Sequence, residues 1–173
     1  AIINQIAETP ANIANPVIAE KIAESPETST AVLQTIITAN PTVVAVLEAV
    51  LSNPNVTAAI INQIAETPAN IANPVVAEKI AENPATSAAV LQTIITSNGA
   101  VAAVLEAVVS NPNVTTAIIN QIAETPANIT NPVIAEKIAE LTSSSTVLES
   151  IIEANPTSTE IALAVVGNAN INS

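Results

Sequence analysis

The chain has 173 residues, of which 49% are apolar and 10% are charged, and it contains no aromatic residue, Cys, Met or His. Its 15 acidic residues are all Glu and its three basic residues are all Lys, so the net charge is −12. This composition excludes a disordered chain of low hydrophobicity, disulfides and thiolate metal sites, and a nucleic-acid surface of clustered cations or stacking aromatics. No apolar run approaches the ~20 residues of a membrane-spanning helix, so no membrane span is expected.

The segment AIINQIAETPANI opens the chain at Ala1 and recurs from Ala59 and from Ala117, with a period of 58 residues. Residues 1–58 and 59–116 differ at only ten positions. A period of this length predicts a repeat architecture. We therefore expect one continuous array over residues 1–173, which consists of repeat 1 (1–58), repeat 2 (59–116) and repeat 3 (117–173), the last diverging from residue 141 as a capping segment.

Each repeat holds four apolar segments that are separated by prolines. Within them, apolar residues recur three or four positions apart, as Val43, Val46, Leu47 and Val50 do. This spacing is typical of one face of a helix and differs from the alternation of a strand. The four predicted helices, of about 9–11 residues each, contain in chain order the segments AIINQIA (1–7), VIAEKIA (17–23), AVLQTII (31–37) and VAVLEAV (44–50).

Polar residues beside the prolines predict where these helices begin and end. The pairs at 15–16 and 40–41 are both Asn-Pro, which places a capping side chain before a proline at the first helical position. Proline fits that position because its missing N–H would have no partner there. The helix over AVLQTII is expected to be capped by Thr28 or Ser29, and the Asn-Pro pair at 53–54 to end the following helix.

Helices this short are marginal alone, and their β-branched residues weaken them further, so they need stacked neighbours. The sequence therefore predicts an all-α fold, an α-solenoid of about twelve short helices with four in each repeat. One motif, N-P-x-T-S-x-x-V-L-x-x-I-I, is formed by Asn83, Pro84, Thr86, Ser87, Val90, Leu91, Ile94 and Ile95. This motif resembles the short-helix α-solenoids of the leucine-rich-repeat-variant and HEAT-like kind, and the resemblance implies the same fold.

The two ends of the chain are predicted to make self-assembly contacts. The chain opens on Ala1, Ile2, Ile3 and Ile6, without the polar cap that closes a self-contained array, and it stops where the next AIINQIA would begin. We interpret it as a processed product or an excerpt whose partner is itself, in a homopolymer or as the continuation of a longer array. Head-to-tail contacts give an open filament unless they close into a ring. The predicted contact residues at the other end are Ile161, Val165 and Ile171.

Three sequons have both a structural and a functional interpretation. They begin at Asn55, Asn113 and Asn128. Such asparagines are glycosylation acceptors in a secreted eukaryotic protein. The structural interpretation is that the threonines of the first two sequons, Thr57 and Thr115, cap helices.

The repeated segment AEKIAE also has two interpretations. Lys21 and Glu24 are spaced for an ion pair on one helix face, whereas columns of Glu along an array would suit Ca²⁺. No cofactor and no enzymatic activity are expected, because the chain has neither His nor Cys and its only glycines are Gly99 and Gly167, too far apart for a phosphate loop.

These features favour a structural role, in which stacked repeats form a filament, stalk or surface layer. The low fraction of charged residues would limit repulsion between neighbouring copies. The alternative is an α-solenoid scaffold that binds a protein or peptide, or an adhesin segment. The absence of sulfur-containing and aromatic residues is what we expect of a protein made in bulk, and the predicted location is extracellular or at the cell surface.

Overall fold

The computed structural model describes residues 2–170 of the chain. Within this range the protein is entirely helical, with fifteen α-helices and no strand, so the predicted all-α class is confirmed. The helices are short, and the longest has 11 residues. In chain order they are α1 (Ile2–Ala7), α2 (Pro10–Ala14), α3 (Pro16–Glu24), α4 (Thr30–Ala39), α5 (Val44–Leu51), α6 (Ala58–Ala65), α7 (Pro68–Ala72), α8 (Pro74–Glu82), α9 (Ala88–Asn98), α10 (Ala102–Ser110), α11 (Thr116–Ala123), α12 (Pro126–Thr130), α13 (Pro132–Leu141), α14 (Ser145–Ala154) and α15 (Thr159–Gly167).

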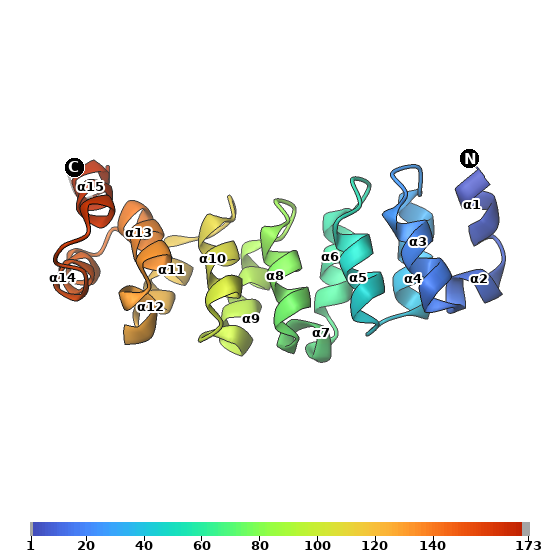
Figure 1. Cartoon of the computed structure of the whole chain (residues 1–173), viewed down its shortest axis with the longest axis horizontal. Coiled ribbons are helices and arrows are strands. Elements are labelled where there is room, and N and C mark those ends of the chain that lie inside the picture. Colours follow the sequence, from blue (N-terminus) through green and yellow to red (C-terminus); the bar gives the residue numbers. More distant parts are fainter. Residues whose placement is uncertain (1, 171–173) are drawn as a thin grey trace.

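The helices form an elongated array of layers that follow the order of the sequence (Figure 1). The first row consists of α3, α5, α8, α10, α13 and α15, each of which contacts the next helix of the row. The other helices form the second row, in which α2 contacts α4, α4 contacts α6, α7 contacts α9, α9 contacts α11 and α12 contacts α14. We call each first-row helix, together with the second-row helices directly before it in sequence, a layer. The first layer, α1–α3, forms the leading end of the array, and the last layer, α14–α15, forms the trailing end.

Each repeat has five helices, so the total exceeds the twelve that the sequence predicted. The additional helices are α2, α7 and α12, five residues each. In repeat 2, Pro68 has no N–H to donate to the carbonyl of Ile64, and α6 ends at Ala65. The side-chain amide of Asn70 donates to that Ile64 carbonyl instead, at 3.0 Å. One proline therefore splits the second-row element of every other layer into two helices.

The predicted helix starts are confirmed at two positions and wrong at a third. Asn15 caps α3 and Ser29 caps α4, each through its side-chain oxygen. Asn40 starts no helix, because α5 begins only at Val44. Asn40 lies instead at the C-terminal end of α4, where its buried side chain bonds to two carbonyl oxygens. An asparagine before a proline fits both the start of one helix and the end of another, so local sequence alone does not distinguish the two.

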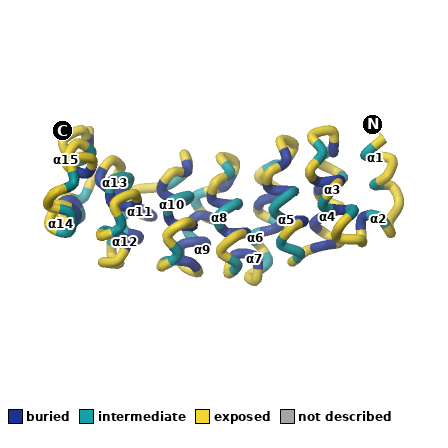
Figure 2. The backbone as a smooth tube through the Cα atoms, viewed as in Figure 1, coloured by how far each residue is buried: buried dark blue, intermediate teal, exposed yellow. Residues whose placement is uncertain are grey.

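The core is aliphatic and runs without interruption through all layers (Figure 2). Its largest fully buried side chains include Leu33, Leu47, Leu91 and Leu105, one in each of α4, α5, α9 and α10. Burying one such side chain contributes roughly 1.5–3 kcal/mol to folding. Because each helix has only two or three turns, this burial between layers, rather than helix propensity, stabilises the array.

Ser87 gives a direct test of helix capping. Its side chain accepts a hydrogen bond from the N–H of Val90 at the start of α9. Replacing Ser87 with Ala leaves that N–H without its partner, so we expect the free energy of unfolding to fall by about 1 kcal/mol in urea denaturation. Thr96→Ala is the matched control, because Thr96 is exposed and its hydroxyl donates to the Gln92 carbonyl within its own helix, away from the helix start. An equal loss in both variants would contradict the cap.

Candidate functional site

A ladder of asparagine side chains joins successive layers along the second row. Asn98 is representative: its amide donates to the Ile94 carbonyl of its own layer at 3.1 Å and to the Ile71 carbonyl of the preceding layer at 2.8 Å. Asn40, Asn70, Asn128 and Asn155 make the same pair of bonds, with distances to the preceding layer between 2.7 and 3.3 Å. The boundary between layers is therefore fixed in register by hydrogen bonds as well as by apolar packing.

A second set of asparagines fastens the ends of first-row helices. Asn53 follows α5 and donates to the carbonyls of Ala23 and Ser25 in the preceding layer, at 2.6 and 2.8 Å. Asn111 and Asn168 make equivalent bonds after α10 and α15. All three side chains are buried. Sequence reasoning assigned no such role to these asparagines, although their recurrence every 58 or 57 residues was visible.

The leading face exposes apolar side chains that are buried elsewhere in the array. Ile2 is 75% exposed, whereas Ile60, at the same position in repeat 2, is 0% exposed because the preceding layer covers it. Ile6 is 39% exposed, against 2% for its counterpart Ile64. Ile3 is only partly exposed and packs against the core, and Ala1 lies outside the described residues. Two of the four predicted leading contacts, Ile2 and Ile6, therefore lie exposed on this face.

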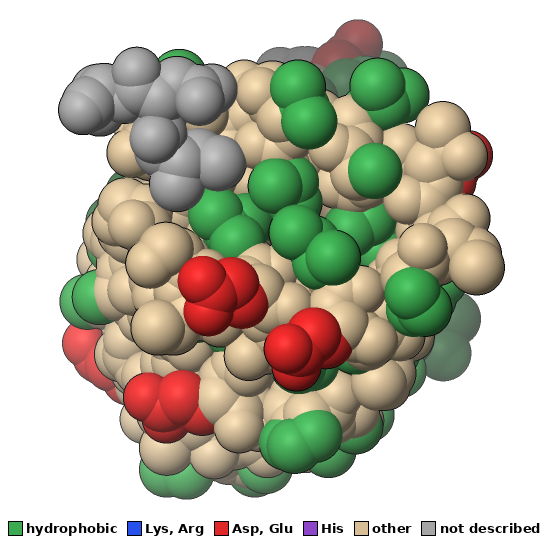
Figure 3. Space-filling view, turned by 90° about the vertical axis from the view of Figure 1, so that its left-hand side faces the viewer, with side chains coloured by type: hydrophobic (Ala, Val, Ile, Leu, Met, Phe, Trp, Pro, Cys, Tyr) green, Lys and Arg blue, Asp and Glu red, His purple; other side chains and the backbone are tan. Residues whose placement is uncertain are grey.

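The trailing end exposes apolar side chains (Figure 3), but they are not the predicted ones. Ile161 is buried in the core and Val165 is half-buried against it, so the prediction of Ile161 as an end contact is wrong. With 3.6 residues per turn, the opposite side of α15 carries Leu163 and Val166, which are 67% and 74% exposed. Ile171 lies outside the described residues.

Ile152 of α14 adds to this exposed apolar surface at the trailing end. It is 45% exposed, whereas Ile95, its counterpart in α9, is 5% exposed. Acidic side chains border the apolar patch in the view of this end (Figure 3). Three glutamates of the last layer stand where the inner layers have Gln, Thr and Ala: Glu149, Glu153 and Glu160. The last layer therefore has three glutamates, whereas the equivalent inner layers α4–α5 and α9–α10 have one each, Glu48 and Glu106.

The three sequon asparagines all use their side-chain amides within the fold. Asn55 donates to the carbonyls of Pro26 and Thr28, and Asn113 makes the equivalent pair of bonds. Asn128 is buried and donates to Gly99 and Ile122. The helix caps predicted within the first two sequons are confirmed, since the threonine side chains accept N–H bonds at the starts of α6 and α11. Glycosylation of these asparagines stays a prediction, and at Asn128 it would require a buried amide to leave two carbonyl partners.

The predicted ion pairs are present once in each repeat. Lys21, Lys79 and Lys137 each contact the glutamate three residues later, at 2.7 to 2.8 Å. The hydrogen bond that Lys79 donates to the Glu82 carboxylate raises the pKa of Lys79 above its ordinary value, and the negative charge of Glu48 in the preceding layer adds to the effect. Such exposed pairs contribute little to stability.

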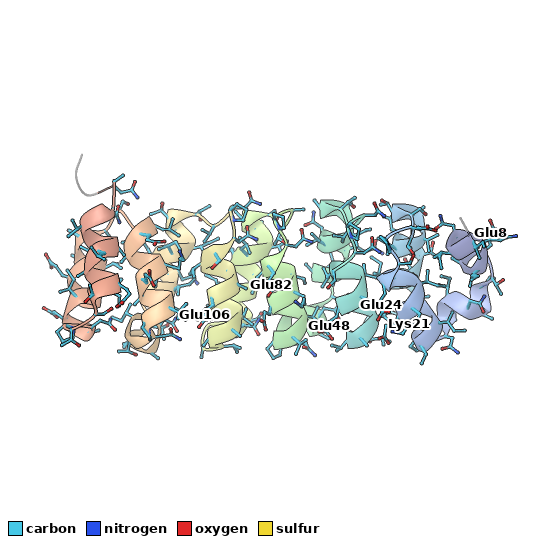
Figure 4. All side chains as sticks on the ribbon, turned by 45° about the horizontal axis from the view of Figure 1, so that its top comes forward. Glu8, Lys21, Glu24, Glu48, Glu82 and Glu106 are labelled. Carbon is cyan, nitrogen blue, oxygen red and sulfur yellow. The ribbon has the colours of Figure 1, made fainter. Side chains whose placement is uncertain are left out.

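Glutamates extend along the first row from layer to layer (Figure 4). Glu20, Glu24 and Glu48 line a shallow groove of about 360 Å³ between α3, α5 and α8, together with Lys79. Nowhere in residues 2–170 do three or more acidic side chains lie close enough together to hold a metal ion. The acidic row is therefore a solvated surface with dispersed charges, and among the described residues no cluster of glutamates supports the predicted calcium sites.

Among the described helices, none has the length and hydropathy to cross a membrane.

At both end faces, apolar side chains are exposed whose counterparts in the inner layers are buried. Comparison of the chain with protein families, with curated proteins and with solved structures finds no match. The resemblance to leucine-rich-repeat-variant and HEAT-like repeats therefore stays a prediction.

Proposed function

We propose that this chain is a structural repeat protein, an α-solenoid segment of an extended filament, stalk or surface assembly that lengthens by stacking layers on its ends. The leading face carries the proposal. Ile2 and Ile6 are exposed there, although Ile60 and Ile64 are buried by a preceding layer. A further layer of the same kind, in the same polypeptide or from another copy, would bury the exposed pair in the same way.

The side chains along the array favour a structural role over recognition of a ligand. Binding energy at protein interfaces is concentrated in aromatic and arginine side chains, and this chain has neither. Successive repeats also present nearly the same polar residues, whereas a scaffold or adhesin that reads a varied ligand needs different ones. Nothing in the shallow acidic groove favours a ligand-binding scaffold or an adhesin. The extracellular location remains a prediction.

Sedimentation velocity and negative-stain electron microscopy of the purified chain test the proposal. We expect the average mass to rise with protein concentration, and elongated assemblies to appear. Salt should strengthen association, because the net charge of −12 makes copies repel one another and about 0.5 M NaCl shortens the screening length below ~5 Å. Monomers at every concentration and salt level would contradict self-assembly.

An Ile2→Glu variant locates the contact. A buried carboxylate without a partner costs several kcal/mol, so we expect association to weaken by about 100-fold or more. Val17→Glu is the matched control, with the same change of charge at a residue that is exposed here and, as Val75 and Val133, in the inner repeats. If both variants assemble equally well, the leading face is not the contact.

A further inference from the structure

The two ends of the array carry complementary halves of the ladder bond. At the inner boundary between α4 and α7, Asn70 donates to the Pro41 carbonyl of the preceding layer at 2.9 Å. Asn12 stands at the position of Asn70 in the leading layer, and among the described residues its side-chain amide makes only the bond within its own layer, to the Ile6 carbonyl at 2.9 Å. Pro156 stands at the position of Pro41 in the trailing layer, and its carbonyl accepts no hydrogen bond within residues 2–170. Among the described residues, the leading end therefore has an amide N–H that is available to donate, and the trailing end has a carbonyl oxygen that is available to accept.

The exposed apolar side chains at the two ends also correspond to residues that pack together at the inner boundary. The inner boundary buries Ile37 of α4 and Leu51 of α5. Their counterparts in the last layer are Ile152 and Val166, which are exposed. The leading face offers Ile2 and Ile6 at the positions of the residues that complete this boundary inside the array, as described above. Bringing the ends together would bury both sets.

One polar contact also has counterparts at both ends. Gln63 of α6 donates to the hydroxyl oxygen of Thr38 in α4 at 3.3 Å. The corresponding residues are Gln5 at the leading end and Glu153 at the trailing end. A carboxylate accepts an amide N–H more strongly than a hydroxyl does. The acidic residue at this position therefore suits a Gln5 partner.

We propose that the leading face binds the trailing layer of a second copy of this chain in the register of the inner layers, with Asn12 of one copy donating to the Pro156 carbonyl of the other. This inference rests on the proposed function and names its partner. The joint is heterologous, so each added copy leaves one free leading face and one free trailing face.

Cysteine cross-linking tests the register, because the chain has no cysteine of its own. Gln5→Cys and Glu153→Cys variants are prepared separately, mixed, and treated with a short bismaleimide. We expect a cross-linked dimer in the mixture and none with either variant alone. A chain carrying both Thr38→Cys and Gln63→Cys is the matched control, since it should cross-link within one molecule at the inner boundary. Adding Asn12→Asp to the Gln5→Cys variant should abolish the dimer, because a carboxylate would face the Pro156 carbonyl.

The outcomes separate the joint from the function. A dimer formed by Gln5→Cys alone would show that leading faces meet each other, which would overturn the head-to-tail joint. Assemblies seen by sedimentation without the mixed cross-link, while the inner control cross-links, would also overturn the joint but leave self-assembly standing. If the unmodified chain forms no assembly at any concentration, both the joint and self-assembly between copies are wrong.

Discussion

Replacing Leu47 with Ala is expected to lower the free energy of unfolding by about 2–5 kcal/mol. Leu47 lies in α5 and is 1% exposed. Its removal takes away buried apolar surface and leaves a cavity that the neighbouring layers close only partly. Because every layer depends on the layers beside it, we expect loss of helical circular dichroism at a lower urea concentration.

Leu163→Ala is the matched control for this change. Leu163 lies in α15 and is 67% exposed, so the same substitution removes little buried surface. We expect a change within about 0.5 kcal/mol, as for other surface positions. If the two variants lose equal stability, the side of α5 that faces the core has been assigned incorrectly.

The helical pattern was predictable because it depends on residues close in sequence. Spacings of three and four identify the buried stripes of α4, α5, α6 and α8, and the asparagine or serine before a stripe identifies a cap. Such signals repeat in each copy, which strengthens each assignment. The fold class and the caps at Asn15 and Ser29 followed from local chemistry alone.

The role of the asparagines was not predictable in the same way, because it depends on contacts between layers. Asn40 reaches the Ile13 carbonyl, 27 residues earlier in sequence. Nothing local distinguishes this role from that of an N-cap, since both place Asn before Pro. The recurrence of asparagine about every 28 to 30 residues, at Asn40, Asn70, Asn98 and Asn128, is the signal that could have indicated a ladder. The prediction of Ile161 as an end contact was wrong for a related reason. An apolar residue in the last layer faces either the core or the open end, and only the orientation of α15 decides which.

The ladder leads to the second large prediction, that Asn98→Asp will destabilise the array severely. Asn98 is 3% exposed and donates both N–H groups of its amide to carbonyl oxygens. A carboxylate of nearly the same shape would place a buried negative charge against two acceptors. We expect a loss of about 3–5 kcal/mol at neutral pH, comparable to breaking a buried ion pair. Urea denaturation followed by circular dichroism measures it.

Two further variants separate charge from position. Asn98→Ala removes the donors without adding a charge, so we expect a smaller loss, of about 1–3 kcal/mol for the unsatisfied carbonyls. Asn12→Asp makes the same chemical change at the exposed end of the ladder, where only one bond is lost. This variant should therefore lower the free energy of unfolding of the isolated chain by only about 1 kcal/mol.

The pH dependence gives Asn98→Asp its most specific signature. Burial raises the pKa of an aspartate above the ~3.9 of the unfolded chain, so the charged form is penalised only in the folded state. The penalty is present at neutral pH, shrinks as the pH falls through the raised pKa, and is gone below the unfolded pKa. The stability difference between Asn98→Asp and Asn98→Ala should therefore narrow on acidification, because the alanine variant has no group there to titrate. A difference that stays constant between neutral and acidic pH would mean that the position is hydrated, and that the ladder does not hold the layers through buried bonds.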